Sequence, residues 1–193
     1  MPGLASLLAE LTCGDDESAE AAAGLLPEYG AAAFVALQDL RLSRRTDTRW
    51  WAVRALAGWP SSAPVTRELI GALDDEAGEV RQCAAVALSR HPDPQAIPAL
   101  IRALSISDSL TAKLVANALI RIGAPAVPEL LQLLQNGKHV ARLEAVRALA
   151  EIEDPRAIPA LMKLLGEDSA VMEYWAGHGL DRLGLGMLYL KPQ

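Results

Sequence analysis

The sequence predicts an all-α fold, a right-handed α-solenoid of about six helix pairs of ~31 residues each. Leucines recur at intervals of 30, 32, 31, 30 and 31 residues: Leu26, Leu56, Leu88, Leu119, Leu149 and Leu180. A small residue or a valine stands four positions before each of these leucines: Ala22, Ala52, Ala84, Val115, Ala145 and Ala176. A second set of leucines follows 11 to 13 residues after the first five: Leu37, Leu69, Leu100, Leu130 and Leu161. Because one helix pair of this size cannot bury its apolar side alone, successive pairs must stack.

The N-terminal residues 1–15 are expected to cap the first repeat with a short helix. Four leucines recur there at helical spacing: Leu4, Leu7, Leu8 and Leu11. The repeats occupy residues 16–182, and residues 183–193, which depart from the repeat pattern, are expected to form a C-terminal cap. The whole chain, 1–193, is therefore predicted to be a single domain.

Within each repeat, the apolar residues are spaced as on two α-helices. The first helix is rich in alanine, whose small side chain lets neighbouring helices approach closely. The second helix has apolar residues on one face, as in this series: Ile97, Leu100, Ile101 and Leu104. Prolines separate the helices, and Asp93 and Asp154 beside them are expected to accept hydrogen bonds from free backbone N–H groups. No stretch shows the alternating pattern of a strand.

The composition excludes several classes of protein. With 51% hydrophobic and 22% charged residues, the chain can form a folded core. No apolar run approaches the roughly 20 residues of a membrane span. The N-terminus lacks the basic stretch of a secretory signal, and two cysteines make no disulfide framework. We therefore expect a cytoplasmic protein that does not bind a membrane.

Charge is distributed unevenly along the chain. The net charge is −6, and the first 40 residues contain seven acidic residues and no lysine or arginine. Five arginines follow directly: Arg41, Arg44, Arg45, Arg49 and Arg54. An acidic protein without a basic stripe is not expected to bind nucleic acid, which requires many cations to neutralise phosphates.

Two stretches resemble HEAT repeats of the phycobilisome-lyase type. They are Val80-Arg81 with the alanines that follow, and the run from Asp154 to Leu161. The resemblance extends over about residues 16–182. It implies the α-solenoid fold and leaves the function open, because such arrays serve many unrelated roles.

The arginine that follows the valine in these repeats usually packs between successive first helices. Arg49 and Arg142 stand at the corresponding positions of other repeats. The last repeat has Glu173 at this position, which suggests a terminal, capping unit.

The sequence lacks the residue patterns of several known metal, nucleic-acid and catalytic sites. Deoxyhypusine hydroxylase, which has similar repeats, binds iron through His-Glu pairs, whereas the three histidines here precede Pro92, Val140 and Gly179. HEAT-like DNA glycosylases have a basic concave face, which the acidic composition does not provide. There is no Gly-rich phosphate loop, H-E-x-x-H, C-x-x-C or G-x-S-x-G motif. We therefore expect no catalytic residue, no metal ligand and no cofactor.

The second helices of a HEAT array line its concave face, and we expect this face to bind a protein. The side chains expected there are Asp39, Glu68, Arg102, Glu129, Gln132 and Lys163. Their mixed charge suits a peptide or a complementary protein surface better than a polyanion. The alternative is that these are ordinary solvated positions.

Arg49, Trp50 and Arg54 form a possible second binding surface. Tryptophan and arginine are enriched among the residues that dominate interface energies. The alternative is that Trp50 packs on an arginine stem or under a loop.

These observations favour a non-catalytic adaptor, a monomer or weak dimer that binds a protein or peptide on its concave face. The alternative is a phycobilin-lyase-like subunit acting in chromophore attachment. A bilin has propionate groups and needs convergent cations, and only Arg102 and Lys163 stand in the relevant column of the repeat. Two repeats separate them by roughly 20 Å, which is too far for one chromophore.

Overall fold

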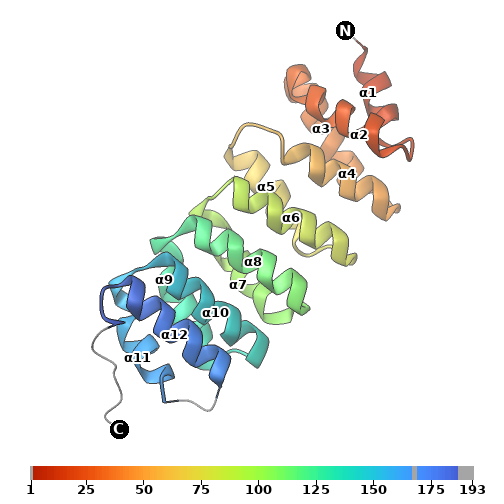
Figure 1. The fold of residues 1–193 in the computed structure, drawn as a ribbon. Coiled ribbons are helices and arrows are strands. Elements are labelled where there is room, and N and C mark those ends of the chain that lie inside the picture. Colours follow the sequence, from red (N-terminus) through yellow and green to blue (C-terminus); the bar gives the residue numbers. More distant parts are fainter. Residues whose placement is uncertain (1, 167–168, 187–193) are drawn as a thin grey trace. The chain divides into compact units, whose positions relative to one another are not determined.

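A computed structural model describes residues 2–166 and 169–186 of the chain (Figure 1). These residues form α-helices and short 3-10 turns, and none of them lies in a strand. The contacts divide the chain into two compact units, Met1–Ala96 (unit 1) and Ile97–Gln193 (unit 2). In each unit the helices pair and the pairs stack, so the predicted all-α solenoid class is confirmed.

Unit 1 contains the N-terminal helix and the first repeats. Its α-helices are α1 (Leu4–Leu11), α2 (Asp16–Leu25), α3 (Gly30–Arg41), α4 (Thr46–Leu56), α5 (Ala63–Ala72) and α6 (Gly78–Arg90). Its 3-10 turns are Leu26–Tyr29 and Pro94–Ala96. Helix α1 packs on α2, and α4 packs on α2, α3 and α6. The predicted N-terminal helix is therefore present, with Leu7 and Leu11 buried.

Unit 2 contains three further helix pairs. Its α-helices are α7 (Ile97–Ile106), α8 (Ser109–Ile122), α9 (Val127–Asn136), α10 (His139–Ile152), α11 (Ile158–Leu164) and α12 (Ala170–Arg182). Its 3-10 turns are Ala124–Ala126 and Pro155–Ala157. Helix α10 packs between α8 and α12, and these three first helices form one row in Figure 1, with α7, α9 and α11 behind them. The expected C-terminal cap falls mostly on residues 187–193, outside the described part of the chain.

The core consists of the residues that repeat in the sequence. All six leucines of the first set and all five of the second are at most 1% exposed. The alanines and the valine four positions before the first set are fully buried. Since these side chains are small, successive first helices can approach closely enough to exclude water.

At several helix starts, side-chain oxygens accept hydrogen bonds from backbone N–H groups, as the sequence predicts for Asp93 and Asp154. Asp93 accepts a hydrogen bond from the backbone N–H of Gln95, and Asp154 accepts one from Arg156. At the start of α8, Asp108 accepts hydrogen bonds from two backbone N–H groups. These hydrogen bonds, with one from the Thr111 hydroxyl, lower the pKa of Asp108.

Gly179 allows a close approach between α10 and α12 of unit 2. A Cβ atom at Gly179 would lie 2.8 Å from Cα and 2.9 Å from Cβ of Ala150. A Cβ atom at Gly177 on the same helix would meet only Leu165, at 4.0 Å. Gly179 stands in a column of the repeat that otherwise holds alanine or leucine. Without a side chain at this position, α12 can lie against the backbone of Ala150 in α10.

We expect Gly179→Ala to lower the free energy of unfolding by about 1–3 kcal/mol, because the new methyl group overlaps the backbone of α10. The matched substitution Gly177→Ala should raise it by up to about 1 kcal/mol through helix propensity. Urea unfolding followed by circular dichroism measures both. Equal effects of the two substitutions would contradict the tight packing at Gly179.

Candidate functional site

Arg49, expected on a binding surface, is buried at the start of α4. Its side chain is 7% exposed, and that of Asp75 is 10% exposed. The guanidinium donates from Nε to Asp75 Oδ2 at 2.8 Å and from Nη2 to Asp75 Oδ1 at 2.9 Å. It also donates to the backbone carbonyl of Ser43 at 3.0 Å. Arg49 is thus part of the structure of unit 1 and cannot contact a partner from this position.

The same column of the repeat has the same structural role elsewhere. Arg81 donates to the carbonyl oxygens of Asp75 and Glu76, both at 2.9 Å. Arg142 donates from Nε to the carbonyl of Leu134 at 3.0 Å. Each arginine ties the start of a first helix to the segment that precedes it.

Burial and charge act in opposite directions on Asp75. Burial by itself raises the pKa of Asp75. Hydrogen bonds from Arg49 and from the N–H of Ala77, with the charges of Arg49 and Arg81, outweigh it, and the pKa lies below its ordinary value.

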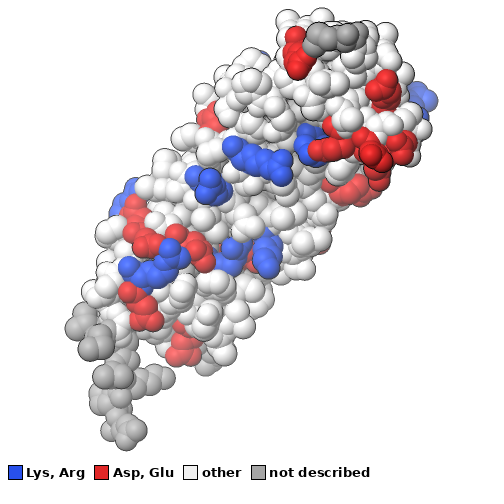
Figure 2. All heavy atoms as spheres, turned by 45° about the horizontal axis from the view of Figure 1, so that its top comes forward, with Lys and Arg blue, Asp and Glu red and all other residues white. Residues whose placement is uncertain are grey.

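Trp50 and Arg54 are the accessible members of the second candidate surface. Trp50 is half-buried and meets Trp51 edge to face, with ring centroids 4.8 Å apart. Arg54 forms an ion pair with Glu20 of α2. The arginine-rich stretch is therefore largely neutralised by acids of unit 1, and acidic side chains gather over the N-terminal helices in Figure 2.

The concave-face residues differ in exposure. Five of the six side chains are exposed: Asp39, Arg102, Glu129, Gln132 and Lys163. Glu68 is 8% exposed and accepts hydrogen bonds from Arg41 Nε at 2.6 Å and Gln38 Nε2 at 2.7 Å. Glu68 is therefore held between α3 and α5 rather than offered to a partner. Repeat spacing could not separate it from Glu129, because its burial depends on Arg41 in the preceding helix.

A hollow of about 540 Å³ lies among α9, α10 and α11 of unit 2. We call it the basic pocket, and its lining residues are Leu131, Leu134, Gln135, Arg142, Arg156, Pro159, Ala160, Lys163 and Leu164. Three of these side chains are cationic and none is acidic. The leucines, the alanine and the proline provide apolar walls. The pocket therefore suits an amphipathic anion.

The basic groups of the pocket come from three different elements. Arg142 belongs to α10, Arg156 to the 3-10 turn Pro155–Ala157, and Lys163 to α11. Arg156 is held by the Asp154 carboxylate, at 2.8 and 2.7 Å, and donates to the carbonyl of Ala124 at 2.7 Å. These contacts orient the guanidinium before any ligand arrives.

The ion pair beside the pocket changes the pKa of both of its partners, Asp154 and Arg156. Hydrogen bonds from Arg156 lower the pKa of Asp154 to about 2, and Asp154 in turn raises the pKa of Arg156. Lys163 is exposed, so its ammonium group can reach an anion that enters from solvent.

A second hollow of about 420 Å³ lies on the other side of α9. It contains two of the predicted residues, Glu129 and Gln132, with Asn136, Lys138 and apolar contributions from Ile101. The structure thus places Glu129 and Gln132 together and Lys163 in a different hollow. Among the predicted residues of unit 2, these three therefore line two separate hollows.

No group of three or more metal-binding side chains occurs within the described residues. His91 is buried, and its two ring nitrogens lie 2.7 Å from Ser61 Oγ and 2.9 Å from the carbonyl of Ala57.

Among the described segments, no single helix is long and apolar enough to cross a membrane. Only α8 together with the Ala124–Asn136 segment reaches that length and composition, and the two are bent by 117°.

Comparison with known proteins identifies the repeats. The model of HEAT repeats matches residues 35–119 and 104–181, which is most of the chain. The chain belongs to the HEAT-repeat family. This HEAT-repeat chain is 36% identical over 123 residues to a phycobilisome maturation protein of Synechococcus elongatus, covering 62% of this chain and 58% of that protein.

A second curated relative and a solved complex are also similar to this chain. A phycocyanobilin lyase subunit beta of Pseudanabaena tenuis is 43% identical over 76 residues, 39% of the HEAT-repeat chain and 27% of that protein. The matches thus span less than two thirds of either curated relative. The solved complex of CpcE and CpcF of phycocyanin lyase from Nostoc shares the fold, with a TM-score of 0.56 and 24% identity, covering 95% of this chain and 78% of that chain.

These relatives correct the expectation of a non-catalytic adaptor, since they are named for bilin lyases and phycobilisome maturation. Arg102 and Lys163 belong to one column of the second helices and come from helices two repeats apart, α7 and α11. The structure instead brings Arg142 and Arg156 to Lys163 from other elements. Both arginines stand in segments that resemble the repeat, but repeat spacing does not show that they share a hollow.

We expect Asp75→Asn to lower the free energy of unfolding at neutral pH by about 3 kcal/mol, because it leaves Arg49 buried without its anion. Since the folded pKa of Asp75 is depressed, the wild type should lose this stabilisation as the pH falls below about 4. Urea unfolding at pH 7 and pH 3 measures the difference. The control Glu76→Gln, at a carboxylate 83% exposed, should change stability by less than about 1 kcal/mol.

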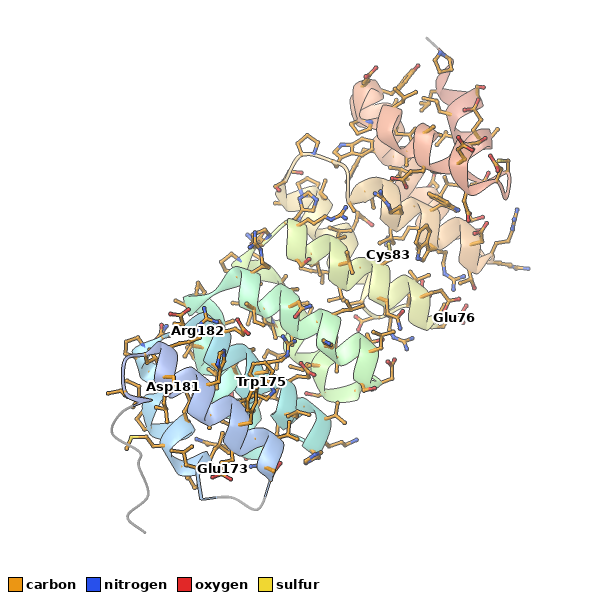
Figure 3. All side chains as sticks on the ribbon, viewed as in Figure 1. Glu76, Cys83, Glu173, Trp175, Asp181 and Arg182 are labelled. Carbon is orange, nitrogen blue, oxygen red and sulfur yellow. The ribbon has the colours of Figure 1, made fainter. Side chains whose placement is uncertain are left out.

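The two cysteines should differ in reactivity. Cys83 lies on α6 (Figure 3), where burial raises its pKa to about 11. Cys13, in contrast, is exposed. At pH 8 the raised pKa lowers the thiolate fraction of Cys83 roughly one hundredfold relative to a thiol of pKa 9. We expect iodoacetamide to label Cys13 first and Cys83 only slowly, as peptide mass spectrometry can show. Equal labelling rates in the folded protein would contradict the burial of Cys83.

Proposed function

We propose that this HEAT-repeat chain is a bilin-lyase-type subunit that holds a linear tetrapyrrole during its attachment to a phycobiliprotein. The observation that carries the proposal is the basic pocket, where Arg142, Arg156 and Lys163 surround a hollow with leucine walls. The names of the relatives, which are at least 36% identical over the matched segments, support the same substrate class.

A bilin matches the pocket in size and chemistry. The volume of about 540 Å³ lies within the range of roughly 300–1,000 Å³ that is typical of small-molecule sites. Propionate groups can accept charge-assisted hydrogen bonds from the arginines, which bind carboxylates in a two-pronged geometry. The pyrrole rings can lie against Leu131, Leu134 and Leu164. The cationic side chains thus suit the propionates, and the leucines suit the pyrrole rings.

The residues of the pocket bind and orient rather than react. The lining contains no cysteine, serine or histidine, and in this proposal its one amine, Lys163, acts as a cation that binds a propionate. We assign the group that reacts with the bilin to the acceptor or to a partner subunit. The contribution of this chain is to hold the chromophore in a productive position.

We further propose that the chain acts with a second protein in the cytoplasm. One relative is named as a lyase subunit, and the CpcE–CpcF structure is a complex of two proteins. The exposed residues Asp39, Arg102, Glu129 and Gln132 are the predicted contacts for this protein partner.

Titration with phycocyanobilin tests the proposal. Binding should change the visible absorption band of the bilin. The variant Arg156→Glu with Lys163→Glu should weaken binding at least ~10-fold, because two cations become anions beside the propionates. The control Arg67→Glu with Arg121→Glu changes the net charge equally at exposed positions outside the pocket, and should bind like the wild type. Equal binding by both variants would overturn the pocket assignment.

Chromophore transfer is tested separately with an apo-phycobiliprotein subunit as acceptor. The chain, alone and with a candidate partner subunit, should increase the yield of covalent adduct seen as bilin fluorescence in a denaturing gel. Bilin binding without any gain in adduct under both conditions would limit the function to chromophore carriage.

A further inference from the structure

The second residue of each first helix changes character between the two units. In unit 1 the helices α2, α4 and α6 have acidic residues there: Glu17, Asp47 and Glu79. In unit 2 the helices α8, α10 and α12 have apolar residues there: Leu110, Val140 and Val171. Acidic residues in the first turn are stabilised by the helix dipole, so the pattern of unit 1 is explained by helix formation alone.

The apolar residues of unit 2 are not explained by the fold of the unit. Leu110 is 55% exposed, Val140 39% and Val171 53%. Ile106, just before α8, is 71% exposed. We call Leu110, Val140 and Val171 the apolar row. These three residues occupy equivalent, exposed positions of successive repeats, so a partner that spans the three repeats could cover them together.

The spacing of the row fits an α-helix laid across it. Helix α10 packs between α8 and α12, and packed helices are about 8–10 Å apart. Residues seven apart on one face of a helix are about 10.5 Å apart along its axis. A partner helix with apolar residues at every seventh position can therefore contact all three members of the row.

Charge around the row indicates which partner helix fits. Asp108 and Ser169 cap α8 and α12 with side-chain hydrogen bonds. Lys138, the N-cap residue of α10, provides no side-chain cap, and Lys138 and His139 are exposed beside Val140. A carboxylate from the partner would there meet a lysine and the unsatisfied N–H groups of the first turn.

We propose that the apolar row binds an amphipathic α-helix of a partner protein, apolar at every seventh residue, with a carboxylate beside the central apolar residue. The proposal goes beyond the bilin function and does not depend on the basic pocket. It explains why the same position of the repeat is acidic in unit 1 and apolar in unit 2.

A displayed library of amphipathic helices of roughly 20 residues, selected on the full chain, tests this surface. Enriched helices should carry apolar residues seven apart and Asp or Glu next to the central one. Fluorescence anisotropy should show at least ~10-fold weaker binding to the variant with Leu110→Ser, Val140→Ser and Val171→Ser. The control with serine at Glu17, Asp47 and Glu79 should bind within about threefold of the wild type. In both variants serine replaces exposed residues, and circular dichroism verifies their folding.

A second measurement uses the unmodified chain. Replacing the central carboxylate of the selected peptide by lysine should weaken binding at least ~10-fold through repulsion by Lys138 and the start of α10. Enriched helices that bind the row variant as tightly as the wild type would overturn the proposal. A wild-type dimer that dissociates in the row variant during sedimentation would assign the row to a second copy instead. Row-dependent co-sedimentation with phosphatidylglycerol vesicles would assign it to a membrane surface and also overturn the proposal.

Discussion

The stacking of helix pairs is the constraint on which the rest of the structure depends. A single pair leaves one apolar side uncovered, and the next pair covers it only if the helices approach closely. The columns of alanine and leucine in the first helices meet this requirement, and they are fully buried. At Gly179 the helices α10 and α12 are so close that no side chain fits, because the backbone of Ala150 occupies the space that it would need.

Stacking also leaves polar groups of the turns partly buried, and arginine side chains donate hydrogen bonds to them. Turns between packed helices contain carbonyl groups and carboxylates that are partly removed from water and need partners. Arg49, Arg81 and Arg142 supply donors at the same position of three repeats. As a result, several arginines of unit 1 form internal ion pairs: Arg41, Arg49 and Arg54. Acidic partners therefore offset the charge of this arginine-rich stretch.

The basic pocket forms in unit 2 under the same rules. Arg142 holds the carbonyl of Leu134 and lines the pocket as well, so one side chain has a structural and a candidate binding role. Arg156 is oriented by Asp154 and Ala124, whereas Lys163 stays available. An arginine held by hydrogen bonds beside an exposed lysine is a suitable arrangement for binding a carboxylate next to an apolar wall.

The sequence by itself determined the helix pairs, their stacking, the buried columns and the helix caps at Asp93 and Asp154, because these follow from periodicity and local hydrogen bonding. Arg102, Gln132 and Lys163 occupy equivalent positions of α7, α9 and α11 and are exposed, and their contact with a partner stays a prediction. Only the tertiary structure decided that Arg49 and Glu68 are internal and that Arg142, Arg156 and Lys163 share a hollow. The physical reason is that burial and convergence depend on side chains from neighbouring helices, whose distances no spacing within one repeat specifies.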